Sequence, residues 1–126
     1  MKGEERFING YIYLIKIIEP KSSFYGCRYI GKHIGNNKYY ISGGNIVKSI
    51  IKKYGKNSIE RSVIVENINN EILLNHLEIH YIRLYNTFRK YNLMGLNLTL
   101  GGEGTIEGYR SFGKNHYFAV SIVQFS

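Results

Sequence analysis

Three segments of the chain are rich in β-branched and aromatic residues, an arrangement of apolar positions that predicts β-strands. Residues 11–18 carry a single charged side chain and stop at Glu19-Pro20, where a proline turn ends the strand. Residues 27–33 form the second predicted strand, and the short polar loop between the two predicts an antiparallel hairpin. Residues 59–66 form the third predicted strand.

Apolar residues at helical spacing predict two helices. The first is marked by Ile46, Val47, Ile50, Ile51 and Tyr54, and Gly55 follows them as the expected C-terminal stop. The second is expected to run from about Glu71 to Tyr85, with Asn69-Asn70 as its N-terminal cap.

The order strand, strand, helix, strand, helix predicts an α+β fold, with a small antiparallel three-stranded sheet flanked by helices. In the third strand, alternation is expected to place Ile59, Val63 and Val65 on one face and Ile64 on the other. A chain of 126 residues is long enough for one domain. We assign residues 1–104 to this domain and residues 105–126 to a C-terminal tail.

The net charge of the chain limits the kinds of partner that it is expected to bind. The formal net charge of +8 and the sequence pI of about 9.6 favour a polyanion, with nucleic acid first and an anionic membrane surface second. A membrane surface is disfavoured because no predicted helix combines a basic face with Trp or Phe anchors.

The chain contains no aspartate, which excludes nuclease designs that gather aspartates around two metal ions.

Composition also bears on the compartment. The single cysteine, Cys27, permits no intrachain disulfide and suits a reducing environment. The polar N-terminus leads into no long apolar stretch, so neither a secretory signal nor a transmembrane helix is expected. We therefore expect an intracellular protein. The oligomeric state is left open, with a monomer favoured. The abundance of Ile, Asn, Lys and Tyr suggests a viral, phage or organellar genome.

Lysines occupy much of the surface of the first predicted helix and of the turn that follows it. They are Lys48, Lys52, Lys53 and Lys56. Such a run is ordinarily a solvated helix face. In a chain this basic, contact with the phosphates of DNA is the alternative.

Glu78 is the most informative single residue of the second predicted helix. Its neighbours one turn away are Leu74, Asn75, Tyr81 and Ile82, so the carboxylate lies on a largely apolar face. A charge there is costly unless it is paired or binds a metal. A salt-bridged glutamate at the edge of the core and a metal ligand both satisfy this pattern.

Tyrosine is the other residue type with chemical potential. Most of the 12 tyrosines must simply pack, but Tyr13 and Tyr29 lie in the two strands of the hairpin, and Gly31 follows the second. With Glu78 on the later helix and Asn97 after it, the order of these parts resembles the GIY-YIG nuclease family.

Two triplets and three longer segments carry the resemblance, which covers about residues 10–104. The triplets that name the family stand here as Tyr11-Ile12-Tyr13 and Tyr29-Ile30-Gly31, and residues 39–44, 52–57 and 97–102 are similar to its phage and virus branch. The resemblance implies a β-β-α-β-α core and the activity of a homing endonuclease.

The resemblance also implies residue roles. Tyr29 is expected to act as the general base on the attacking water, with Tyr13 as its strand partner. Glu78 is expected to bind the divalent metal, Mg²⁺ or alternatively Mn²⁺, and Asn97 to support the site from its far end. Mg²⁺ suits a single carboxylate because it prefers oxygen ligands and keeps most of its waters.

Further positions match or depart from the family. Lys32 matches a lysine of the repair-nuclease branch, and Tyr40 falls where other members have a His or Tyr near the scissile phosphate. Tyr11 replaces the glycine of the first triplet, which puts a side chain where the backbone is usually bare.

An arginine of the family is missing, because its expected position holds Tyr39. Its implied role is to hold the phosphate and offset charge in the transition state. Lys32 and His33 are the nearest candidates to replace it, with Lys48 more distant. A lysine supplies the charge but not the bidentate geometry of a guanidinium.

The sequence thus predicts a metal-dependent endonuclease that hydrolyses DNA phosphodiester bonds. The alternative is a degenerate relative, a basic module that binds nucleic acid without cutting it. Residues 113–116 resemble the opening of a modular DNA-binding motif that follows the catalytic domain in homing enzymes, so we interpret residues 105–126 as the truncated start of such a region. Weak site specificity is expected for this chain.

Overall fold

A computed structural model describes residues 8–102 of the chain, and the predicted tail at residues 105–126 lies outside the described residues. The described part is an α+β domain, which confirms the predicted class. Its elements, in order, are β1 (Gly10–Ile17), β2 (Arg28–Ile34), α1 (Asn45–Tyr54), the short 3₁₀ helix η2 (Lys56–Ser58), β3 (Ile59–Ile68) and α2 (Glu71–Leu84).

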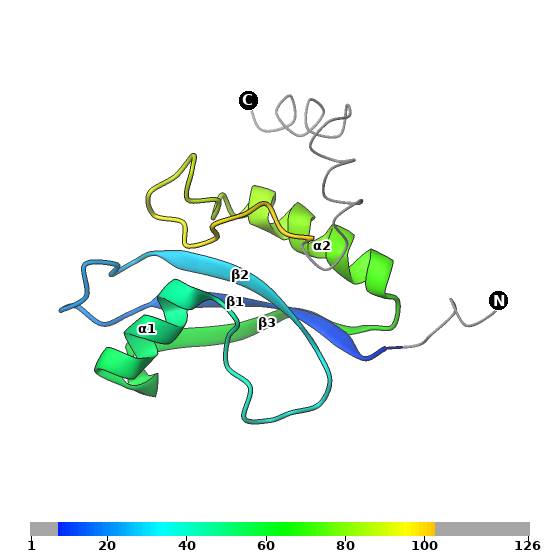
Figure 1. Ribbon diagram of the computed structural model, residues 1–126, viewed down its shortest axis with the longest axis horizontal. Coiled ribbons are helices and arrows are strands. Elements are labelled where there is room, and N and C mark those ends of the chain that lie inside the picture. Colours follow the sequence, from blue (N-terminus) through cyan, green and yellow to red (C-terminus); the bar gives the residue numbers. More distant parts are fainter. Residues whose placement is uncertain (1–7, 103–126) are drawn as a thin grey trace.

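The three strands form one antiparallel sheet in the order β2-β1-β3, so the first strand of the chain is central (Figure 1). Its residues pair with β2 in a regular register, in which Tyr13 lies opposite Gly31 and Ile15 opposite Tyr29. Paired residues of antiparallel strands share a face, so this register decides which side chains meet.

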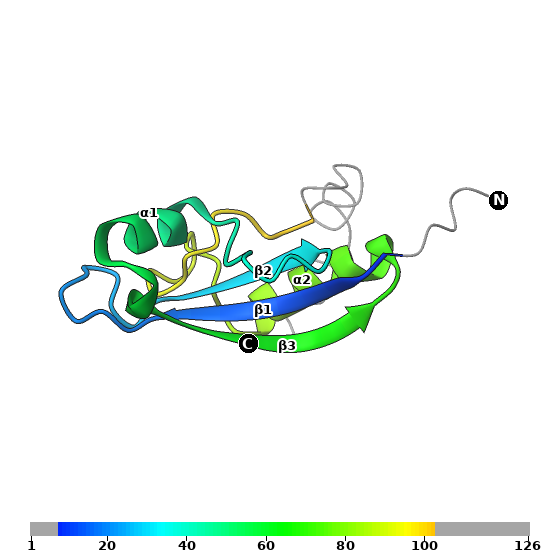
Figure 2. The same ribbon diagram turned by 90° about the horizontal axis from the view of Figure 1, so that it is seen from below.

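Both helices begin and end close to where the sequence predicts. Gly55 stops α1: its φ of 93° lies in the left-handed region, and its N–H donates to the carbonyl of Ile51 at 2.7 Å. At the start of α2, the Asn70 side chain accepts a hydrogen bond from the N–H of Leu73 at 2.9 Å. Figure 2 shows α1 on one side of the sheet, and Figure 1 shows α2 running along the β2 side.

The central strand is buried on both faces, and each face has its own core. One cluster lies on the α1 side; its fully buried members are Tyr13, Ile15, Ile17 and Val47. The other cluster packs against α2; its fully buried members are Ile12, Ile30, Leu74 and Ile82. Alternation along the strands therefore sorts the side chains of the hairpin into two separate environments.

The register between β1 and β3 is irregular, and this overturns one expectation. Gly10 pairs with Ile68, Ile12 with Val65 and Tyr13 with Val63, so extra residues of β3 are left unmatched between these pairs. Such a bulge reverses the alternation of the strand that carries it. The prediction that Val65 shares a face with Val63 is therefore wrong, and Val65 packs against the core on the α2 side.

Within residues 8–102, no helix combines the length and the apolar composition needed to cross a membrane.

Candidate active site

Tyr13 is at the centre of a group of polar aromatic side chains on the α1 face of the sheet. The ring has no exposed surface, and its hydroxyl accepts a hydrogen bond from the N–H of Gly43 at 3.1 Å. The same hydroxyl lies 2.9 Å from the hydroxyl of Tyr40. The loop that carries Tyr40 and Gly43 is thus fixed over the strand that carries Tyr13.

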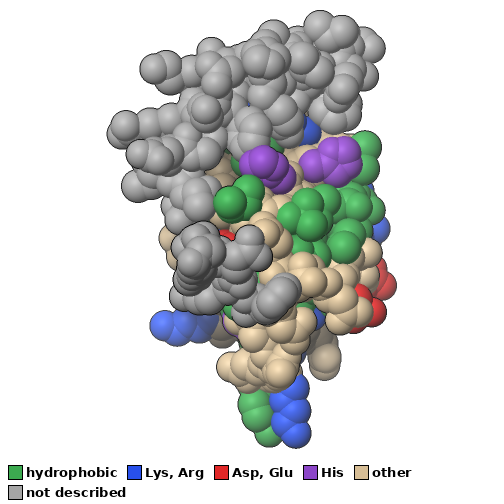
Figure 3. Space-filling model, turned by 90° about the vertical axis from the view of Figure 1, so that its right-hand side faces the viewer, with side chains coloured by type: hydrophobic (Ala, Val, Ile, Leu, Met, Phe, Trp, Pro, Cys, Tyr) green, Lys and Arg blue, Asp and Glu red, His purple; other side chains and the backbone are tan. Residues whose placement is uncertain are grey.

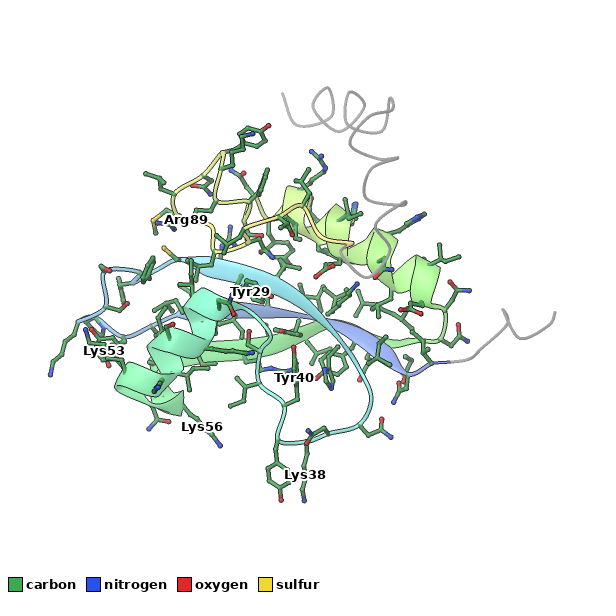
Figure 4. The ribbon with its side chains drawn as sticks, in the orientation of Figure 1. Tyr29, Lys38, Tyr40, Lys53, Lys56 and Arg89 are labelled. Atoms are coloured by element: carbon green, nitrogen blue, oxygen red, sulfur yellow. The ribbon has the colours of Figure 1, made fainter. Side chains whose placement is uncertain are left out.

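Tyr29 belongs to the same face. Its ring centroid lies 6.2 Å from that of Tyr13, and its phenol packs against Gly44, the N-cap residue of α1. A Cβ added at Gly44 would lie 2.8 Å from the ring of Tyr29, so only glycine permits this approach. Because a helix N-terminus carries partial positive charge, it stabilises negative charge on a neighbouring group. Figure 4 shows Tyr29 beside the first turn of α1 and Tyr40 on the loop that precedes it.

Two neighbouring rings have shifted protonation equilibria. Burial, followed by the hydrogen bond with Tyr13, raises the pKa of Tyr40 far above that of free tyrosine, so its hydroxyl keeps its proton. The imidazole of His33 stacks on Tyr40 with ring centroids 3.5 Å apart. Burial, and then the charge of Arg61, lowers the pKa of His33. The lowered pKa favours the neutral form of His33 at pH 7.

Arg61 is the cation that the sequence reasoning missed. It projects from β3, and its guanidinium carbon lies 4.6 Å from the ring centroid of Tyr13 and 5.4 Å from that of Tyr11. Its Nη2 donates to the hydroxyl of Tyr11 at 2.8 Å, and its Nε donates to the carbonyl of Ile41 at 2.9 Å. The sequence contains the signal for this placement. Arg61 is two residues from both Ile59 and Val63, which were expected to share one face, and alternation along a strand puts Arg61 on that face too.

A second polar group surrounds Glu78 on the α2 face. Glu78 is only 6% exposed, and its Oε1 accepts the N–H of Gly102 at 3.0 Å. The ammonium of Lys32 lies 3.8 Å from the same oxygen and also donates to the side chain of Asn75. The expected apolar setting of Glu78 is confirmed, and the carboxylate has both a cation and a backbone donor.

Two consecutive glycines, Gly101 and Gly102, lie next to the carboxylate of Glu78. Gly101 and Gly102 have φ values of 95° and 74°, and a Cβ on Gly101 would lie 3.1 Å from Oε1 of Glu78. The backbone can approach the carboxylate because neither residue has a side chain. Asn75, one turn from Glu78, was seen in the sequence as a neighbour but was given no role there.

Lys32 and His33, the two nearest candidates to replace the missing arginine, face opposite sides of the sheet. Successive residues of a strand alternate. Lys32 accordingly meets Glu78 on the α2 side, whereas His33 meets Tyr40 on the α1 side. The predicted site residues therefore form two groups, and both adjoin β2, an edge strand of the sheet.

Asn97 is bound to the outer edge of β2, where the preceding Gly95 already pairs with Arg28. It is 5% exposed, its Oδ1 accepts the N–H of Ile30 at 2.9 Å, and its Nδ2 donates to the carbonyl of Ile30 at 2.7 Å. The hydroxyl of Thr87 also donates to Oδ1 at 2.7 Å. The side-chain amide thus makes the two hydrogen bonds that a residue of an adjacent antiparallel strand would make.

The four lysines assigned to DNA contact, Lys48, Lys52, Lys53 and Lys56, are all exposed. Figure 4 shows Lys53 and Lys56 projecting away from the helix and its following turn. None of these lysines takes part in the contacts described above for Glu78. None takes part in those described for the tyrosine group, which comprises Tyr11, Tyr13, Tyr29 and Tyr40 with His33 and Arg61.

Glu78 is the residue for which the sequence predicts a metal ion. In the described part of the chain, no three or more His, Cys, Asp or Glu side chains are grouped so that they could hold a metal ion together. His76 and His80 are exposed one turn apart on α2, and Figure 3 shows two histidine side chains close together next to apolar ones. A pair of histidines lacks the further ligands of a zinc site.

Compared with known proteins, the chain matches no family model, no curated protein and no solved structure.

Proposed function

We propose that the chain is a metal-dependent DNA endonuclease with a GIY-YIG-like site. The observation that carries the proposal is the nearly buried carboxylate of Glu78, held by Lys32 beside an edge strand whose opposite face bears Tyr29. Buried charges are costly, so a carboxylate maintained in such a place is a candidate for function. The net charge of +8 suits a DNA substrate.

Tyr29 is the proposed general base. Free tyrosine has a pKa near 10, so a tyrosine needs help to accept a proton at neutral pH. The N-terminus of α1, against which the phenol packs, provides favourable electrostatics for a negative oxygen. Tyr13 and Tyr40 are not proposed as bases. Tyr40 keeps its proton, and its hydroxyl is hydrogen-bonded to that of Tyr13, so these two phenols hold the loop before α1 in place.

The carboxylate of Glu78 fits the divalent ion that the resemblance implies. It is an oxygen donor, and Mg²⁺ commonly binds through one or two carboxylates while keeping several waters. When bound there, Mg²⁺ or Mn²⁺ would supply positive charge to the phosphate. Lys32, which balances Glu78 in this structure, is the cation on that face that could contact a phosphate oxygen in place of the missing arginine.

Nicking of supercoiled plasmid with Mg²⁺ tests the proposal. Glu78→Gln and Tyr29→Phe should each lower the rate by about 100-fold or more, the usual range for loss of a general base or an electrostatic partner. Glu60→Gln and Tyr25→Phe, at exposed positions, are the matched controls and should cleave normally. Undiminished cleavage by both site variants would refute the mechanism.

A binding module is the second candidate, and one observation favours it. Tyr13 bonds with Tyr40, and Arg61 with Tyr11, so much of the polar chemistry on the α1 face is satisfied within the chain. Binding of DNA that weakens with salt, without cleavage under Mg²⁺ or Mn²⁺ and unaffected by Glu78→Gln, would decide for the module.

A further inference from the structure

A pocket of about 360 Å³ opens at the end of the sheet where β1 begins and β2 ends. Its walls come from the start of β1, the loop after β2 and the bulged part of β3. This volume lies within the range of small-molecule sites. None of the residues assigned to catalysis from the sequence lines it, but Tyr11 and Arg61, which both contact Tyr13, do.

Two residues in the walls of the pocket have left-handed backbone conformations. The unmatched residues of β3 lie here, and Asn67 among them has a φ of 61°, in the left-handed region. Gly35, on the opposite wall, has a φ of 120°, and its N–H donates to the carbonyl of Asn9 at 2.8 Å. Bulges commonly redirect side chains next to functional sites.

The lining combines cations with amides. Arg61 and Lys38 supply two positive charges, and Glu66 supplies one negative charge. Nε and Nη2 of Arg61 bond with the chain, whereas Nη1 has no hydrogen-bond partner among residues 8–102, which leaves it available to a ligand. Guanidinium groups are suited to phosphate because several N–H donors lie in one plane.

The amides present complementary hydrogen-bonding groups. Asn9 donates to the side-chain oxygen of Asn36, so Asn36 keeps its own NH₂ group as a donor and Asn9 keeps its oxygen as an acceptor. An adjacent donor and acceptor match the edge of a nucleobase. Asn67 adds a further amide on the wall formed by β3.

We propose that this pocket binds one nucleotide of the DNA, with Arg61 and Lys38 on its phosphate and the asparagine amides on its base. The inference rests on the proposed function, since it takes DNA as the substrate. Tyr11 and Arg61 line the pocket and also belong to the tyrosine group. A nucleotide bound here therefore adjoins the tyrosines of the proposed active site, and the pocket confers a local base preference.

Binding of a short fluorescein-labelled DNA duplex to the full chain in EDTA, followed by anisotropy, tests the pocket without cleavage. Asn67→Gly keeps the left-handed backbone and removes the amide; Asn86→Gly, with a φ of 56° outside the pocket, is its match. Lys38→Gln removes a lysine that lies over the ring of the next tyrosine, and Lys90→Gln removes a similar one elsewhere. Figure 4 shows Lys38 on the loop that follows β2.

We expect Asn67→Gly to weaken binding by about fivefold or more, as for loss of a base contact. Lys38→Gln should reduce the slope of log affinity against log salt by about one. Both control variants should bind within about twofold of the unmodified chain. Pocket variants that behave like their controls would overturn the inference.

A second measurement needs no variant. In the unmodified ¹⁵N-labelled chain, the same duplex should shift the side-chain amide signal of Asn67 and leave that of Asn86 in place; equal shifts, or none at Asn67, would overturn the inference. The two proposals can fail independently. If the unmodified chain nicks plasmid DNA but the pocket variants bind the duplex like their controls, only the pocket proposal is rejected. If the pocket variants weaken DNA binding but the unmodified chain does not nick, only the nuclease proposal is rejected.

Discussion

Replacement of Asn97 by alanine should destabilise the protein strongly, whatever its activity. The change removes both hydrogen bonds to the backbone of Ile30, at 2.9 and 2.7 Å, in a place where Asn97 itself is 5% exposed. A buried polar group left without a partner costs about 1–3 kcal/mol, so the two groups of Ile30 together cost about 2–6 kcal/mol. The hydrogen bond that the hydroxyl of Thr87 donates to Asn97 is also lost but is left out of this sum.

Such a loss is large beside a total stability of about 5–15 kcal/mol for a typical domain. Urea denaturation followed by circular dichroism measures it as a lower midpoint with an unchanged slope. Thr87→Val, which removes only the hydroxyl, should cost about 1 kcal/mol. Asn69→Ala, at an exposed position, should cost almost nothing. An Asn97→Ala variant within about 1 kcal/mol of the unmodified chain would refute this reasoning.

Three further changes test other parts of the structure. Gly31→Ala would drive a Cβ into the buried phenol of Tyr13 and should cost about 1–3 kcal/mol; an unchanged melting temperature would contradict this close contact. Arg61→Gln should raise the pKa of His33 in an NMR titration, since the charge of Arg61 adds to burial in lowering it; no change would show that burial acts alone. Because the unfolded chain protonates His33 first as the pH falls through about 6.5, His33 disfavours the folded state in acid, and Arg61→Gln should reduce that loss. Asn70→Ala should cost about 1 kcal/mol in urea denaturation through loss of the α2 cap, and full stability would contradict the capping role.

The secondary structure was largely accessible from the sequence because its signals are local. Gly55 ends α1 and Asn70 begins α2 through hydrogen bonds within a few residues of each position. β1 and β2 were located within one residue because a proline turn and a polar loop bound them. Glu78 could be placed in an apolar setting from its neighbours one helical turn away.

Interactions between distant segments were not accessible in the same way. The bulge in β3 arises from its pairing with β1, so alternation within β3 alone gave the wrong face for Val65. The hydrogen bonds of Asn97 join it to a strand 67 positions earlier in the chain. Lys32 and His33 were considered together because they are adjacent in sequence, and the pleat of the strand separates them.

The bulge in β3 also bears on how the protein behaves at high concentration. β3 is an edge strand of the described sheet, and a straight edge is a template on which another chain can add. The two register irregularities interrupt the regular pattern of this edge, and the exposed carboxylates of Glu60 and Glu66 place negative charge along it. The bulge beside the pocket and these charges therefore both disfavour the addition of a second copy to this edge of the sheet.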